Sequence, residues 1–226
     1  MFKTSSLKLE KKKNKYFIHI KKSDRNDKFI NSFLSTTEKI VEKFNLKKYL
    51  NNDEYHIELI INKCTPLSEY LKSGINYKYL EKLYINLNEQ INFLNKKKIS
   101  IMKITHKDIF VWNIFDDVVF VFLNNDNLVD IDYDNKIMIT KPFKMDEYVA
   151  PEMKKIKKLP FTISNKCNLW SLGNIIMYCL KKYKDEKKFN SDYGNDLLEK
   201  ILNTRLYWAV KRNLEKNPAN RFSLLI

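Results

Sequence analysis

The chain has 226 residues, 44% of them hydrophobic, which is enough to bury one sizeable core. A formal net charge of +15 suits a nucleic acid or an anionic membrane as partner, but the lysines are scattered among many asparagines and isoleucines. We therefore interpret most of this charge as solvated surface and expect no nucleic-acid partner. No apolar run reaches the length of a membrane span, and the first residues lack a secretory hydrophobic segment.

The cysteines indicate the compartment. Cys64, Cys167 and Cys179 do not form a C-x-x-C pair, which argues against a disulfide framework or a zinc site and suits a reducing environment. We expect an intracellular protein, cytoplasmic or nuclear. Only the runs 11–15 and 154–158 are dense in lysine, and we interpret both as solvated surface; the alternative is that 154–158 docks an acidic protein partner or substrate.

The first part of the chain predicts strands and one helix. Aromatic and β-branched residues predict a strand at 16–22, and residues 55–61 predict a second strand. Between them, apolar residues recur at helical spacing and predict an amphipathic helix near 26–45.

The remainder predicts mainly helices. Apolar residues at helical spacing between 80 and 94 mark an amphipathic helix, and 195–214 is a last helical region. Residues 169–180 are apolar nearly all round, as in a buried helix. The stretch 117–131 predicts a hairpin, in which an Asn-Asn-Asp turn joins the runs VVFVFL and NLVDI.

The segment HKDIFVWN, at 106–113, has the most informative spacing. Asp108 follows His106 by two positions, and Asn113 follows Asp108 by five. Four more motifs come after it in order: NLVDID (127–132), YVAPEM (148–153), NLWSLG (168–173) and NPANR (217–221). These five ordered motifs resemble those of the eukaryotic protein kinase superfamily, and the resemblance covers most of residues 55–226.

The resemblance implies an α+β class and a bilobal fold. Residues 1–226 would form a single protein-kinase-like domain, with a reduced β-rich N-lobe at about 1–62 and a helical C-lobe at about 65–226. The implied reaction is transfer of the γ-phosphate of ATP to a serine or threonine hydroxyl of a protein.

The resemblance also assigns catalytic roles. Asp108 would orient the substrate hydroxyl, while Asn113 and Asp130 would hold Mg²⁺, or Mn²⁺ in its place. A register that uses Asp132 instead of Asp130 is the alternative, but it would put a charge where the preceding strand should be apolar.

In the N-terminal part, Lys21 would pair with the phosphates of ATP. Its expected ion-pair partner is Glu38, with Glu42 as the alternative one turn further along the helix.

Other matched residues would have structural roles. Glu152 of the A-P-E motif is expected to form one buried ion pair with Arg221. Three more residues are expected to serve the packing of the domain: His106, Trp170 and Gly173.

The sequence departs from the family pattern at places that bear on catalysis. No glycine precedes Gly74, so no Gly-rich loop covers the phosphates. Asp132 stands at the glycine of D-F-G, and Phe110 stands where many Ser/Thr kinases have a lysine. Asn168 replaces the aspartate that braces the catalytic loop.

Two functions therefore stay open. The complete set of Asp108, Asn113 and Asp130 favours an active, divergent Ser/Thr kinase, whereas the departures favour a pseudokinase that acts as a protein-interaction or scaffold module. The segment CTPLSEYLK is similar to a stretch of the Scy-like pseudokinases, which work in membrane trafficking. The degraded D-F-G triplet also resembles that of haspin, an atypical kinase.

Overall fold

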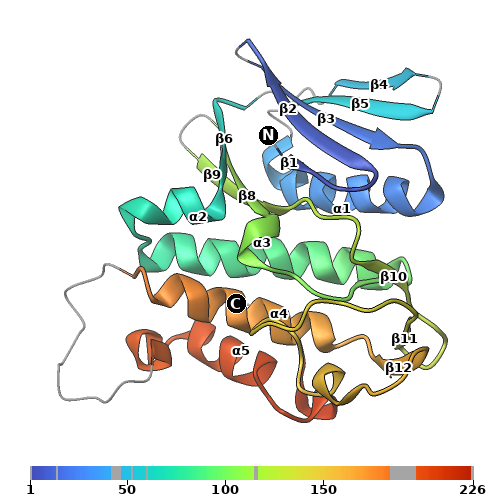
Figure 1. Cartoon of the computed structure of the whole chain (residues 1–226). Coiled ribbons are helices and arrows are strands. Elements are labelled where there is room, and N and C mark those ends of the chain that lie inside the picture. Colours follow the sequence, from blue (N-terminus) through green and yellow to red (C-terminus); the bar gives the residue numbers. More distant parts are fainter. Residues whose placement is uncertain are drawn as a thin grey trace.

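The computed structural model describes residues 2–13, 15–41, 47–51, 53–59, 61–114, 117–183 and 197–224. Within 33–41 and 47–51 it describes the backbone alone. Strands and helices are both well represented, so the predicted α+β class is confirmed (Figure 1).

A five-stranded antiparallel sheet forms from the first part of the chain, in the order β1-β2-β3-β5-β4. Its strands are β1 (Phe2–Lys3), β2 (Leu7–Lys12), β3 (Lys15–Lys21), β4 (Lys47–Asn51) and β5 (Glu54–Leu59). β3 and β5 confirm the two predicted strands. Helix α1 (Asp24–Val41) confirms the predicted amphipathic helix.

One face of this sheet is apolar and packs towards α1. Ile18, Ile20 and Ile57 are buried there, and the Tyr55 hydroxyl donates a hydrogen bond to Asp27 of α1 at 2.8 Å. Because side chains alternate along a strand, the residues between them lie on the outer face. That outer face is polar.

The helical part is built around α3 (Tyr77–Lys96), which lies below the sheet and α1 in Figure 1. Asn76 caps its first turn, accepting from the Tyr79 N–H at 3.1 Å. The other helices are α2 (Leu67–Tyr70), α4 (Cys167–Leu180) and α5 (Arg205–Asn213). Short 3₁₀ turns occur at Leu71–Ser73, His106–Asp108, Met153–Lys155, Leu197–Ile201 and Pro218–Asn220.

Helix α4 confirms the predicted buried helix, and at Gly173 it packs closely against the end of α5. A Cβ at Gly173 would lie 2.8 Å from the Leu214 side chain, so the absence of a side chain permits this contact. The predicted helical region over 195–214 is present from residue 197 onwards, in two pieces. Residues 197–213 divide into a 3₁₀ turn and α5, because Asn203 has a positive φ of 64° and Thr204 caps a new helix.

Three smaller sheets complete the structure: β6 (Lys63–Pro66) with β8 (Ile109–Ile114) and β9 (Asp117–Phe122), β7 (Ile99–Ile101) with β10 (Leu128–Asp130), and β11 (Lys136–Ile139) with β12 (Phe161–Ser164). The predicted hairpin over 117–131 is therefore wrong. β9 pairs with β8, and β10 pairs with β7, because the apolar segment 109–114 forms a strand beside β9.

In the part of the chain that the structure describes, no helix has the length and apolarity needed to cross a membrane.

Candidate functional site

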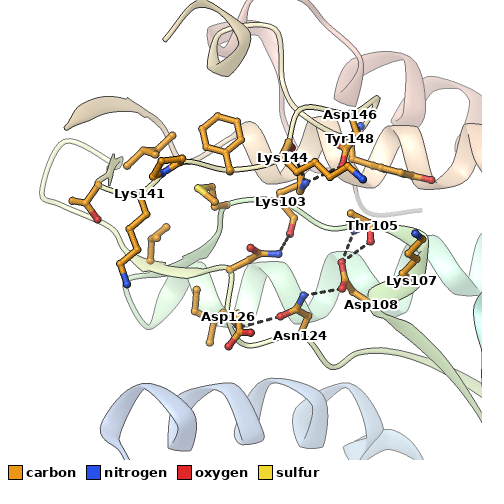
Figure 2. A pocket seen from close by; sticks show the side chains of 18 of the residues that line it. Lys103, Thr105, Lys107, Asp108, Asn124, Asp126, Lys141, Lys144, Asp146 and Tyr148 are labelled. Atoms are coloured by element: carbon orange, nitrogen blue, oxygen red, sulfur yellow. Dashed lines mark hydrogen bonds and ion pairs between the residues drawn. The ribbon is translucent and has the colours of Figure 1, made fainter. Parts of the chain in front are cut away.

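A cavity of about 730 Å³ lies between the helical part and the segment that follows β10 (Figure 2). Its lining comes from three stretches of chain, within 102–108, 124–129 and 138–148, together with Arg25. Charged side chains of both signs line it. This is the cavity that contains Asp108.

Asp108 is held rigidly at the end of a 3₁₀ turn. One carboxylate oxygen accepts from the Thr105 N–H at 2.9 Å and from the Thr105 hydroxyl at 2.7 Å, which closes a capping box. The other oxygen accepts from the Asn124 amide at 2.8 Å (Figure 2). The carboxylate is buried, and both of its oxygens are already engaged.

Strand pairing brings Asn124 to Asp108. β8 and β9 are antiparallel, with Ile109 opposite Phe122, and the Leu123 N–H donates to the Asp108 carbonyl at 3.0 Å. Leu123, the first residue after β9, therefore lies beside Asp108, the residue before β8, and Asn124 comes next in the chain. Sequence reasoning missed Asn124 because it was interpreted as a turn residue. The apolar run that ends directly at Asn124 was the available signal.

Asn125 and Asp126 connect this cavity to the five-stranded sheet. Asn125 donates to Asn26 of α1 at 2.9 Å and to the Ser6 hydroxyl at 2.6 Å. The Asp126 carboxylate accepts from the N–H and the hydroxyl of Ser5. The turn after β9 is thus hydrogen-bonded both to the loop that precedes β2 and to α1.

Asn113 is not brought to Asp108. It lies on β8 between Lys63 of β6 and Val118 of β9. It lies five positions further along the chain than Asp108, or roughly 16 Å at the usual rise of a strand. The expected loop is a strand because Ile109, Val111 and their aromatic neighbours favour extended backbone and pair with β9.

Asp130 is also outside the cavity. Its side chain is 72% exposed and forms an ion pair with Arg25 at 2.6 Å. Leu128 and Val129, just before it, do line the cavity. In the alternative register, Asp132 accepts from the Lys136 N–H in a turn at 2.7 Å. Neither aspartate contacts Asp108.

The expected Mg²⁺ set therefore does not fit the geometry. Mg²⁺ requires several oxygen ligands in a compact octahedron. Asn113 lies on β8 and Asp130 pairs with Arg25, so the two expected ligands do not converge beside Asp108.

Lys21 is exposed at the end of β3 and lies near a second cavity, which does not contain Asp108. It lines that cavity together with Arg25 of α1, and the Asn26 amide donates to its carbonyl at 2.7 Å. Glu38 belongs to α1, but its side chain, like Glu42, lies outside the described residues. The expected ion pair between Lys21 and Glu38 is thus not among the described contacts.

Lys103 is the other residue that sequence reasoning missed. It is buried, and its ammonium donates to Asp146 at 2.8 Å and to the Lys144 carbonyl at 3.0 Å. Figure 2 shows it between the segment with Lys141 and Lys144 and the side that bears Asp108. A lysine in so lysine-rich a chain carries no signal of its own, so only the fold identifies it.

The predicted ion pair between Glu152 and Arg221 is confirmed. Two parallel bonds join them, at 2.6 and 2.7 Å, and Arg221 is fully buried. Its guanidinium also lies 5.2 Å from the ring centre of Trp170. Asn168, which replaces the family's bracing aspartate, donates to the Ser100 hydroxyl of β7 at 3.2 Å.

His106 makes packing contacts. Its ring stacks on Tyr178 at a centroid distance of 4.2 Å, and its Nδ1 lies 2.7 Å from the Tyr148 hydroxyl. Burial, followed by the nearby charge of Lys107, lowers the pKa of His106 below its ordinary value of 6.5. The ring is therefore neutral at pH 7.

No protein-family model matches this sequence, and no curated protein is significantly similar to it. The function is therefore argued from the cavity and its surroundings.

Proposed function

We propose that this chain is a protein-kinase-like domain that acts as a pseudokinase, binding a protein partner without transferring phosphate. The bilobal part of this proposal, with lobes at about 1–62 and 65–226, is supported by the order of elements. A strand-rich sheet with α1 comes first, and the helices around α3 follow. The buried pair of Glu152 and Arg221 supports it as well.

The separation of Asp108 from Asn113 carries the functional proposal. Phosphoryl transfer from ATP is catalysed by positioning and by metal ions that neutralise the phosphates, so the metal ligands must meet at the reacting group. Here the residue that would hold the second ion lies on β8, and Asp130 pairs with Arg25 at the surface. A catalytic set does not assemble around Asp108.

The occupied carboxylate of Asp108 supports the same conclusion. A base or orienting group must accept a hydrogen bond from the substrate hydroxyl. Thr105 and Asn124 already donate three hydrogen bonds to the two oxygens of Asp108, in a buried position, which leaves one of about four acceptor positions. The contacts give Asp108 a structural role, in which it fixes the turn before β8 to the turn after β9.

The expected partner is an acidic protein segment. Four exposed lysines, at 154, 155, 157 and 158, lie next to the apolar side chains of Leu159 and Phe161, which are 37% and 42% exposed. Met138, 57% exposed, is opposite Thr162 on the neighbouring strand and also lines the cavity. A segment that alternates carboxylates with apolar residues complements this surface.

An intracellular location, cytoplasmic or nuclear, belongs to the proposal. The three cysteines are free thiols in the structure, which supports a reducing compartment.

Partner binding is tested with a fluorescent peptide that alternates glutamate and leucine, followed by anisotropy. We expect Lys154→Glu with Lys158→Glu to weaken binding at least tenfold, with a loss of affinity in high salt. The matched control is Lys11→Glu with Lys13→Glu, which changes the net charge equally in the other lysine-dense run. Equal weakening by both double variants would mean that only the net charge matters, and it would refute residues 154–161 as the binding surface.

Nucleotide binding is tested by thermal melts with ATP and Mg²⁺ or Mn²⁺. A ligand at a hundred times its dissociation constant stabilises a folded protein by about 2.7 kcal/mol. We expect no metal-dependent shift. A shift that Asp108→Ala abolishes would contradict the proposal.

One observation favours a second candidate, a divergent Ser/Thr kinase using ATP and Mg²⁺. Asp108 and Asp126 line the same cavity and approach it from neighbouring strand ends. In that case the second carboxylate would be Asp126 in place of Asp130. Its signature would be metal-dependent transfer that both Asp108→Ala and Asp126→Ala abolish.

A further inference from the structure

On the outer face of the five-stranded sheet, we infer a zinc site formed by His19, Glu54 and His56. One ligand atom from each of the three side chains lies within 4.8 Å of the other two. The sequence indicated no zinc site because its cysteines lack the spacing. The imidazoles and the carboxylate come together only when β3 and β5 pair.

The strand register explains this convergence. β3 and β5 are antiparallel, and His19 stands directly opposite His56. Glu54 precedes His56 by two positions, so it projects from the same face. The imidazole rings are 4.6 Å apart between centroids and nearly perpendicular, at 86°. Their Nδ1 atoms approach to 2.6 Å.

Glu10 on the neighbouring strand β2 fixes the proton on His19. The Nε2 of His19 lies 2.9 Å from the Glu10 carboxylate, which accepts its N–H. In the neutral ring this leaves the lone pair on Nδ1, the atom that faces His56. Metal-binding histidines generally donate their other ring N–H to a carboxylate in this manner. This contact is a second observation, independent of the clustering, that favours a metal.

Glu10 is held in place from the other side by two lysines of its own strand, Lys8 and Lys12. Lys21 stands opposite Glu54 in the ladder.

The ligand types select the metal. Two imidazoles and a carboxylate suit Zn²⁺, whereas Mg²⁺ and Ca²⁺ prefer all-oxygen shells. Three protein ligands leave a fourth tetrahedral position for water. The His19 side chain is 16% exposed, so the site is close to the surface. A bound ion would clip β3 to β5 on the face opposite α1, independently of the cavity around Asp108.

The test is a zinc titration of the untagged chain against a chromophoric chelator, in a Cys64→Ser background because Cys64 is only half-buried, whereas Cys167 and Cys179 are buried. We expect one bound Zn²⁺ per chain and no competition from Mg²⁺. His56→Ala and Glu54→Gln should weaken binding more than about 100-fold, and Glu10→Gln by about 10- to 100-fold.

The matched control is Glu58→Gln. Glu58 lies on the same face of β5, two residues beyond His56, where it pairs with Lys15. Its removal should leave the affinity unchanged. Circular dichroism of each variant separates loss of the site from loss of the fold.

Cobalt substitution gives a second readout that does not depend on the variants. Co²⁺ in a tetrahedral nitrogen and oxygen site should give visible absorption bands without a thiolate charge-transfer band. Wild-type protein that does not retain Zn²⁺ against the chelator would overturn the inference, since the histidine pair would then be only a hydrogen bond. Binding unchanged in both His56→Ala and Glu54→Gln, or a thiolate band, would overturn it equally.

Discussion

Removing Glu152 should strongly destabilise the chain, because it leaves the charge of Arg221 buried without a counter-charge. Arg221 is fully buried, while the Glu152 side chain is 17% exposed. Breaking a buried pair on one side costs about 3–5 kcal/mol, and the partial exposure of Glu152 favours the lower end, about 3 kcal/mol. The guanidinium keeps its bond to the Glu215 carbonyl at 2.7 Å, which limits the loss.

The assay is urea unfolding of Glu152→Ala, supported by thermal melts. A loss of about 3 kcal/mol should lower Tm by about 6–12 °C in a chain of this size. The double variant Glu152→Ala with Arg221→Met should recover part of the loss, because no charge then remains buried. The surface pair of Lys136 and Asp134, 3.7 Å apart, is the control, and Asp134→Ala should cost less than about 1 kcal/mol. Equal, small effects of Glu152→Ala and Asp134→Ala would refute the reasoning.

Three further predictions concern the cavity, the outer sheet face and the thiols. Asp146→Ala should destabilise the chain by about 3 kcal/mol in urea unfolding, since it leaves the ammonium of Lys103 buried, and Lys103→Met should recover part of this. The pKa of Glu10 is lowered from 4.5 to about 2, so its stabilisation is complete above pH 4.5 and is lost as the pH falls towards 2. The stability difference between wild type and Glu10→Gln should therefore shrink over that range, and a difference that grows on acidification would contradict the assignment. Burial raises the pKa of Cys64 and Cys167 to about 12, so both should react slowly with a thiol reagent at pH 8 and rapidly after unfolding.

Elements with strong periodicity could be predicted from the sequence. β3, α1, β5, α3 and α4 all lie where alternation or helical spacing indicated them, since each buries one apolar face or is buried all round. The pairing of Glu152 with Arg221 was also predictable, because two motifs 69 residues apart specified it.

The catalytic assignments depended on a loop that the sequence could not establish. The motif spacing placed Asn113 near Asp108, but the residues between them are β-branched and aromatic, and they extend when β9 offers a partner. The same competition moved β10 to β7 and broke the predicted hairpin.

Contacts that depend on the register between strands could not be predicted from the sequence. Asn124 meets Asp108 only because β8 and β9 align, and His19 meets His56 only because β3 and β5 align. A shift of one residue would send each of these side chains to the opposite face, and local sequence alone does not fix that register.

The most direct test of the pseudokinase proposal is transfer of radiolabelled γ-phosphate from ATP, at high protein concentration with Mg²⁺ and then Mn²⁺. Wild-type protein and Asp108→Ala would be compared on a mixture of basic and acidic proteins and on the chain itself. The proposal predicts labelling at the same background level in both. Metal-dependent labelling by the wild type that disappears in Asp108→Ala would contradict it and establish a kinase.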